Sequence, residues 1–239
     1  MVSPDRFRGR IGTTYKDSEP DWFSPATPAN APNVLVILLD DTGFGNLGCY
    51  GSTIDTPNID ALAENGLRYN NFHVTPLCSP SRASLLTGRN HHAVGVATIT
   101  GGGDAGFPNQ RGRISPHAAT LAEILSEEGY ATFALGKWHL NPGQHNSVAG
   151  PHDEWPLQRG FNRFYGFLPG ATDQFYPELT YDNHAVPPPS TPAEGYHLTE
   201  DLTDHAIEFI NDLKAIRPET PFFTYFSQSS ANFIQCAVE

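Results

Sequence analysis

The stretch that decides the fold is NVLVILLDD, Asn33 to Asp41, a continuous apolar run that ends in two aspartates. A run of this kind is typical of a strand that is buried on both faces of a sheet. Signals for helices and strands alternate along the chain on its C-terminal side, so this strand is expected to be the first of several.

Two helices are predicted from their ends, because TPNIDALAENG (56–66) and TLAEILSEEG (120–129) each begin with a capping threonine and stop at a glycine. Apolar residues between 202 and 213 keep helical spacing and predict a third. Three further stretches are predicted strands: LRYNNFHV (67–74), YATFALGK (130–137) and PFFTYFS (221–227). The alternation predicts an α/β fold with a mixed, mostly parallel sheet sandwiched by helices. Residues 1–32 are predicted to form an irregular N-terminal arm.

Composition excludes several classes of function. The net charge of -12, with only 14 Lys and Arg, argues against binding to nucleic acid. Three cysteines are too few for a disulfide framework. No apolar run approaches the roughly 20 residues of a membrane span, and the first 20 residues contain no secretory signal, so a cytoplasmic protein without membrane partners is predicted.

Ligands of open α/β sheets gather at the carboxyl ends of the strands, where this sequence places DD, TPLCSPSR and GKWH. Asp40 and Asp41 would repel each other by about 4 kcal/mol at 4 Å and an effective dielectric of 20. Water or a bound cation would relieve this repulsion, so a solvated turn and part of a cation site both remain open. Calcium takes about 6 to 8 oxygen ligands, so the two aspartates cannot be a complete calcium site.

Cys78 lies where a helix is expected to begin, with Ser79 as N-cap, Pro80 at the first position and a stop at Gly88. Helix N-termini favour anions, and Arg82 follows one turn later. The thiol is therefore either a nucleophile beside an anion site or an inert side chain in a capping turn. The neighbouring charged motifs favour the nucleophile.

Lys137 and His139 follow the strand predicted at 130–137. The lysine is suited to binding an anion, and the histidine to donating a hydrogen bond or passing a proton. A cation site, a nucleophile and cationic groups at one sheet edge are the requirements for cleaving an anionic ester.

The motif CSPSRASLLTGR (78–89) resembles the Cys-x-Pro-Ser-Arg signature of the sulfatase family, within the alkaline-phosphatase-like superfamily. NVLVILLDDTGFGNLGCYG (33–51) and LGKWHL (135–140) resemble the opening strand with its Asp pair and the Gly-Lys-Trp-His element of that family. The resemblance runs from about Asn33 to Ser227 and is nearest to bacterial arylsulfatases. It implies that residues 33–239 are the N-terminal part of a sulfatase catalytic domain.

The resemblance also implies a mechanism. A separate formylglycine-generating enzyme oxidises Cys78 to formylglycine, and one hydroxyl of the hydrated aldehyde attacks the sulfur of a small-molecule sulfate ester. The alcohol leaves, and the second hydroxyl then expels sulfate as the aldehyde reforms. The implied roles are calcium binding, in preference to magnesium, by Asp40, Asp41 and residue 78, support of the hydrated aldehyde by Arg82, and contacts to sulfate and nucleophile by Lys137 and His139.

The pattern of the family breaks after residue 227, since no histidine, Asp-Asn pair or second lysine follows. Asp182-Asn183 comes too early in the chain and is predicted to be a turn. The chain is therefore expected to be truncated on its C-terminal side, with its last strand at an exposed sheet edge, weak calcium binding and little or no sulfatase activity. Two alternatives stay open: a phosphonate or phosphate ester hydrolase of the same superfamily, and a non-catalytic remnant.

Overall fold

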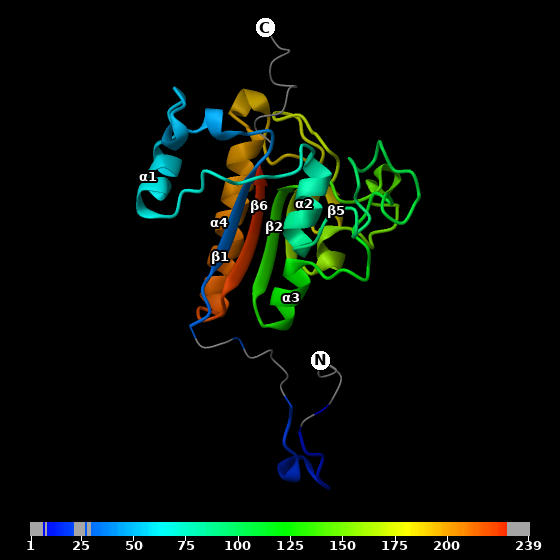
Figure 1. Cartoon of the computed structure of the whole chain (residues 1–239). Coiled ribbons are helices and arrows are strands. Elements are labelled where there is room, and N and C mark those ends of the chain that lie inside the picture. Colours follow the sequence, from blue (N-terminus) through cyan, green and yellow to red (C-terminus); the bar gives the residue numbers. More distant parts are fainter. Residues whose placement is uncertain (1–6, 8, 22–26, 28–29, 229–239) are drawn as a thin grey trace.

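The computed structural model describes residues 7, 9–21, 27 and 30–228, which are built around a six-stranded sheet (Figure 1). The strand order is β1-β6-β2-β3-β4-β5; the first four run parallel, and β4 and β5 are antiparallel additions. The strands are β1 (Val34–Leu39), β2 (Ala131–Lys137), β3 (Arg163–Phe167), β4 (Leu179–Tyr181), β5 (His184–Val186) and β6 (Phe222–Gln228). This confirms the predicted mixed, mostly parallel sheet.

Helices cover both faces of the sheet, with α2 and α3 on one side and α4 on the other (Figure 1). The α-helices are α1 (Pro57–Asn65), α2 (Cys78–Thr87), α3 (Leu121–Glu127) and α4 (Leu198–Ile216). Short 3-10 turns are η1 (Tyr15–Asp17), η2 (Phe44–Asn46), η3 (Gly48–Tyr50), η4 (Gly143–His145), η5 (Pro156–Arg159) and η6 (Pro192–Glu194). The predicted capping threonine of α3 is part of a capping box, in which the Thr120 side chain accepts from the Glu123 amide and the Glu123 side chain accepts from the Thr120 amide. In the described part of the chain, no helix is both long and apolar enough to cross a membrane.

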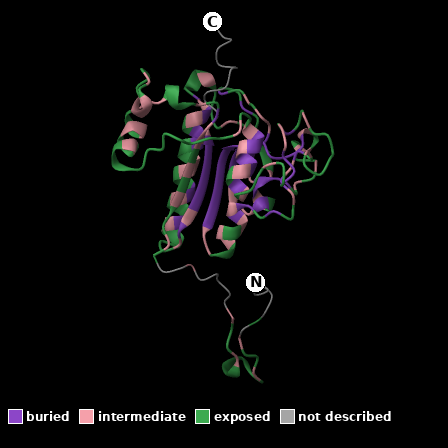
Figure 2. Cartoon of the chain, viewed as in Figure 1, coloured by how far each residue is buried: buried purple, intermediate pink, exposed green. Residues whose placement is uncertain are grey.

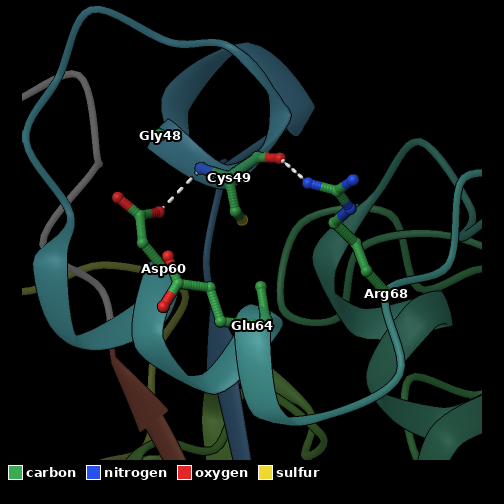
Figure 3. A pocket seen from close by; sticks show the side chains of 6 residues that line it. Gly48, Cys49, Asp60, Glu64 and Arg68 are labelled. Atoms are coloured by element: carbon green, nitrogen blue, oxygen red, sulfur yellow. Dashed lines mark hydrogen bonds between the residues drawn. The ribbon is translucent and has the colours of Figure 1, made fainter.

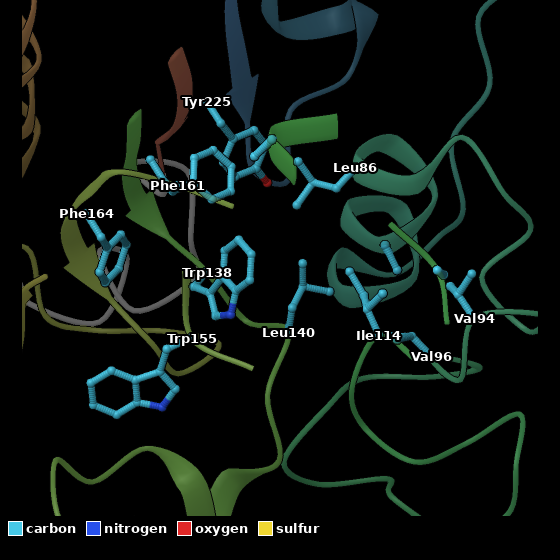
Figure 4. Packing of buried hydrophobic residues seen from close by; sticks show 14 of the residues in the cluster. Leu86, Val94, Val96, Ile114, Trp138, Leu140, Trp155, Phe161, Phe164 and Tyr225 are labelled. Atoms are coloured by element: carbon cyan, nitrogen blue, oxygen red, sulfur yellow. The ribbon is translucent and has the colours of Figure 1, made fainter. Parts of the chain in front are cut away.

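The larger hydrophobic core lies between the sheet and the two helices α2 and α3 (Figure 4). Trp138 is at its centre, edge-on to Phe161 at 6.0 Å between ring centroids. Its indole Nε1 donates a 2.8 Å hydrogen bond to the Glu154 carbonyl, so its only polar atom is satisfied. The tryptophan between Lys137 and His139 thus anchors that segment in the core.

The last strand of the described residues, β6, is central. It lies between β1 and β2, with Val34 opposite Phe223 and Ala131 opposite Phe222. The prediction that it would form an exposed edge is therefore wrong, because the chain returns across the sheet through α4 and fills the place between the first two strands. The carboxyl end of β6 consequently joins those of β1 and β2.

The edge strand beside β6 is instead β1. Ile37 lies opposite Phe226, which packs under α4, so this side of β1 belongs to the α4 face. There Leu35 and Ile37 are 54% and 52% exposed. The prediction that β1 is buried on both faces is wrong, because an apolar run shows that a strand is hydrophobic but not whether a helix reaches across it.

The strand predicted at 67–74 does not form. This segment is irregular and links α1 to α2, and its residues are exposed (Figure 2). The Tyr50 hydroxyl of η3 donates a 2.7 Å hydrogen bond to the Tyr69 carbonyl, so the backbone of the segment at Tyr69 is held by a side chain and not by a partner strand. The sequence analysis did not predict β3, β4 or β5. Asp182-Asn183 forms a turn, as predicted, and this turn joins β4 to β5.

Two predictions concern residues that the structure describes only in part or not at all. Much of the predicted arm, residues 1–32, and the tail at 229–239 lie outside the described residues. In the described part of the arm, Arg10 and Glu19 form an antiparallel bridge. The domain boundaries remain predictions.

A buried carboxylate, Asp201, ties α4 to the sheet. Tyr165 of β3 and Tyr196 donate hydrogen bonds to its Oδ2 at 2.7 and 2.9 Å, and His205 Nδ1 lies 3.1 Å from its Oδ1. Burial disfavours a charged imidazole, but the hydrogen bonds and charge of Asp201 outweigh burial and raise the pKa of His205 above its usual value.

Replacing His205 with glutamine is expected to destabilise the protein in weakly acidic solution, and less so at higher pH. A group whose pKa is raised by folding stabilises the protein fully below its unfolded pKa of about 6.5, and this stabilisation is lost as the pH rises through the folded pKa. Urea denaturation from about pH 6 to about pH 9 should show the difference between the two proteins shrinking. His184→Gln, at an exposed position of β5, is the control. A difference in stability that does not change with pH would contradict an ion pair between His205 and Asp201.

Candidate active site

The carboxyl ends of β1, β6 and β2 bring the first part of the site together. Asp40 directly follows β1, and its amide donates to the Gln228 carbonyl at the end of β6. Lys137 is the last residue of β2, and its Nζ lies 2.5 Å from Asp40 Oδ2. Two of the predicted site residues therefore form an ion pair.

Arg82 of α2 completes a buried charge cluster with Asp40 and Lys137. Its Nη1 donates to the Lys137 carbonyl at 2.8 Å, to Tyr225 Oη at 3.1 Å and to Ser227 Oγ at 2.5 Å. Its Nη2 lies 3.3 Å from Asp40 Oδ1. The three charged side chains are 1%, 7% and 3% exposed for Arg82, Asp40 and Lys137. The cluster holds two positive charges and one negative charge.

The single carboxylate of this cluster is ionised. Burial alone would raise the pKa of Asp40, but the charges of Arg82 and Lys137 and their hydrogen bonds hold it below the usual value. Within the described residues, Arg82 Nε and Nη2 have no hydrogen-bond acceptor with good geometry. Such unsatisfied donors on a buried cation are suited to an anionic ligand.

Cys78 and His139 meet beside this cluster. Cys78 is the first residue of α2, with Leu77 in the N-cap position, so the helix begins two residues earlier than predicted from Ser79 as the cap. The Cys78 Sγ lies 3.2 Å from His139 Nδ1. Burial, and then the positive charges of Lys137 and Arg82, lower the pKa of His139 to about 4. The imidazole is therefore neutral at neutral pH and able to accept a proton.

Three residues at this site were not predicted from the sequence: Thr100, Tyr225 and Ser227. Ser227 could have been predicted, because it lies near the carboxyl end of a predicted strand, where ligands of such sheets gather. Tyr225 is an inward-facing strand residue with no separate signal. Thr100 comes from an irregular Gly-rich loop, and its hydroxyl donates to the His139 carbonyl at 3.0 Å. No local pattern indicated that this loop approaches the histidine.

The described residues do not fit a calcium ion. Asp41 is exposed and has a left-handed backbone, with φ 53°. Asp40 is already paired with two cations, and no group of three or more His, Cys, Asp or Glu side chains among the described residues is arranged to hold a metal. This donor set is short of the 6 to 8 oxygen ligands that calcium takes.

A separate pocket of about 550 Å³ lies between η3 and α1 (Figure 3). Asp60 accepts a hydrogen bond from the Cys49 amide at 2.6 Å, and Arg68 donates to the Cys49 carbonyl. These contacts hold the loop after β1 against α1. None of the predicted site residues lines this pocket, so it is distinct from the site at the strand ends.

The fold and the site together define an α/β protein of the alkaline-phosphatase-like class. The chain belongs to the sulfatase family. Residues 32–236 match the sequence model of this family, which is described as Sulfatase. The family resemblance predicted from the motifs is thereby confirmed.

Individual relatives agree with this assignment. The chain is 35% identical to human arylsulfatase A over 231 residues, which cover 87% of this chain and 42% of that protein. It is similar to the crystal structure of Ps i-CgsB, with a TM-score of 0.71 and 29% identity over 84% of this chain and 45% of that one. The structure of BT4656 with its substrate, D-glucosamine-2-N,6-O-disulfate, has a TM-score of 0.64 and 25% identity over 84% and 35% of the two chains. The chain thus spans less than half the length of these relatives.

Proposed function

We propose that this chain carries the nucleophile side of a sulfatase active site that hydrolyses sulfate esters, aryl sulfates in particular. The observation that supports this most is the 3.2 Å contact between Cys78 Sγ and His139 Nδ1. It joins the Cys-x-Pro-Ser-Arg and Gly-Lys-Trp-His motifs at the carboxyl edge of the sheet. Because the chain spans 42% of human arylsulfatase A, the complete reaction is part of the proposal.

In this proposal Cys78 acts after oxidation to formylglycine by a separate enzyme, and the hydrated aldehyde supplies the attacking oxygen. His139, neutral at pH 7, accepts a proton at Nδ1. Lys137 and Arg82 place positive charge near His139, which contacts residue 78, and this charge would stabilise the negative oxygens of a sulfate ester bound there. These side chains bind and orient the ester.

Asp40 and Asp41 remain the proposed calcium ligands, but the donor set is incomplete in the described residues. A cation would have to compete with Lys137 and Arg82 for Asp40. We therefore expect this chain to bind the ion weakly. The complex of BT4656 with a sulfated glucosamine supports a small sulfated molecule as the substrate class.

The first test is chemical modification of residue 78 in the 239-residue chain, coexpressed with a formylglycine-generating enzyme. Mass spectrometry of the tryptic peptide is expected to show conversion of the cysteine, and purified protein is expected to hydrolyse an aryl sulfate slowly and in preference to a phosphonate monoester. Cys78→Ala should abolish this turnover, whereas Cys49→Ala, in the separate pocket, should retain it.

Other outcomes would overturn the proposal in distinguishable ways. A fully unmodified Cys78 without turnover would favour a non-catalytic sulfatase remnant. Faster hydrolysis of the phosphonate than of the sulfate would favour the phosphonate and phosphate ester hydrolases of the superfamily.

A further inference from the structure

His139 has an unusual backbone for its residue type. Its φ is 53°, in the left-handed region that non-glycine residues seldom adopt and that costs energy to maintain. Both of its peptide groups are held, because its amide donates to the Leu168 carbonyl at 3.0 Å and its carbonyl accepts from Thr100 Oγ1 at 3.0 Å. The surroundings thus fix the direction in which the side chain leaves the backbone.

The two ring nitrogens of His139 have different partners. Nδ1 lies 3.2 Å from Cys78 Sγ, and Nε2 lies 3.2 Å from the Thr100 carbonyl oxygen. A carbonyl oxygen can only accept, so Nε2 carries the hydrogen, and in a neutral imidazole Nδ1 then presents a lone pair. This lone pair faces the side chain of residue 78.

Gly170, in the loop after β3, lies against the imidazole ring. A Cβ added at Gly170 would lie 2.6 Å from Cε1, 2.7 Å from Nε2 and 3.2 Å from Nδ1 of His139. Gly170 is not among the glycines with positive φ, so its backbone would accept an alanine. The imidazole of His139 can therefore occupy its position only because Gly170 has no side chain.

Thr100 also connects the histidine to the start of α2. Its amide donates to Ser79 Oγ at 3.2 Å, and the two hydroxyls lie 3.3 Å apart. Ser79 follows Cys78 directly, and both Thr100 and Ser79 are buried. One residue thus contacts the backbone and ring of His139 and the neighbour of the thiol.

We propose that Thr100 and Gly170 are positioning residues that hold His139 as the Nε2–H tautomer, with Nδ1 directed at the side chain of residue 78. Any use of this lone pair in catalysis rests on the proposed function, but the tautomer does not.

The test is nitrogen NMR of the full 239-residue chain labelled with ¹⁵N-histidine, at neutral pH. Protonated and unprotonated ring nitrogens have well-separated resonances, and His139→Gln identifies the signals of His139 among the ten histidines. One net hydrogen bond of about 1 kcal/mol shifts the ratio of the two tautomers roughly fivefold. We expect at least this shift toward the Nε2–H form, relative to an exposed histidine of the same chain.

Variants then separate positioning from folding. Gly170→Ala should move the ring and reduce the tautomer excess, whereas Gly102→Ala, which meets no atom within 4 Å, should leave the His139 signals unchanged. Thr100→Val should also reduce the excess, and Thr100→Ser, which keeps the hydroxyl, should restore it.

An Nδ1–H tautomer in the unsubstituted protein would overturn the proposal, as would unchanged His139 signals in both Gly170→Ala and Thr100→Val. If either variant fails to fold, the tautomer of His139 in the unsubstituted chain and in Thr100→Ser still tests the proposal. Absence of sulfate ester hydrolysis with the Nε2–H form present would refute the proposed function and leave the positioning roles standing.

Discussion

Replacing Asp40 with asparagine is expected to lower the free energy of unfolding by about 3–5 kcal/mol. The carboxylate neutralises one of two buried cations, Lys137 at 2.5 Å and Arg82 at 3.3 Å. Its removal leaves both positive charges buried without a counter-ion, which costs more than the ion pair itself contributes. Urea denaturation with the slope held common to both proteins measures the change.

Asp41→Asn is the matched control for this experiment. It makes the same chemical change one residue later, at an exposed position, and is expected to alter stability by at most about 0.5 kcal/mol. Adding Lys137→Met to Asp40→Asn should recover part of the loss, because it removes one of the uncompensated charges. Equal effects of Asp40→Asn and Asp41→Asn would contradict the buried cluster.

Replacing Gly136 with alanine is expected to destabilise the fold by about 2–5 kcal/mol, the sum of backbone strain and overpacking. Gly136 lies in β2 with φ 85°, and an added Cβ would meet the Ser227 carbonyl oxygen of β6 at 2.0 Å. That oxygen belongs to the backbone of the neighbouring strand, so it cannot move without separating the two strands. The next residue is Lys137, so the charge cluster would be disturbed as well.

Gly195→Ala isolates the strain from the contact. Gly195 also has a positive φ, 94°, but an added Cβ there meets nothing within 4 Å. This variant should lose about 1–2 kcal/mol, the cost of a left-handed residue with a side chain. Thermal or urea denaturation of both variants gives the difference. A cost at Gly136 no larger than at Gly195 would show that β2 and β6 relax around the methyl group.

Much of the sheet was predictable because its central strands are long and apolar. β2 and β6 were recognised from their runs of hydrophobic residues, and α3 from its capping box. β4 and β5 have three residues each, too few for a periodic pattern. The strand predicted at 67–74 was wrong because weak alternation does not provide a partner strand.

For the site, the motifs predicted which residues gather but not how they pair. Strand ends placed Asp40 and Lys137 at one edge, yet their ion pair depends on the register of β1 and β2 on either side of β6. Thr100 and Gly170 reach His139 from irregular segments, where sequence spacing carries no information on distance. Contacts of this kind depend on tertiary structure alone.

The position of β6 has a consequence for the order of assembly. Among the described strands, β1 comes first in the chain and β2 about a hundred residues later, but β6, which separates them, follows all the others. Contacts between residues so distant in sequence form slowly, because a long loop must close first. Until then Arg82 lacks the hydroxyls of Tyr225 and Ser227. We therefore expect the Cys78 segment to remain accessible on the nascent chain until β6 enters the sheet.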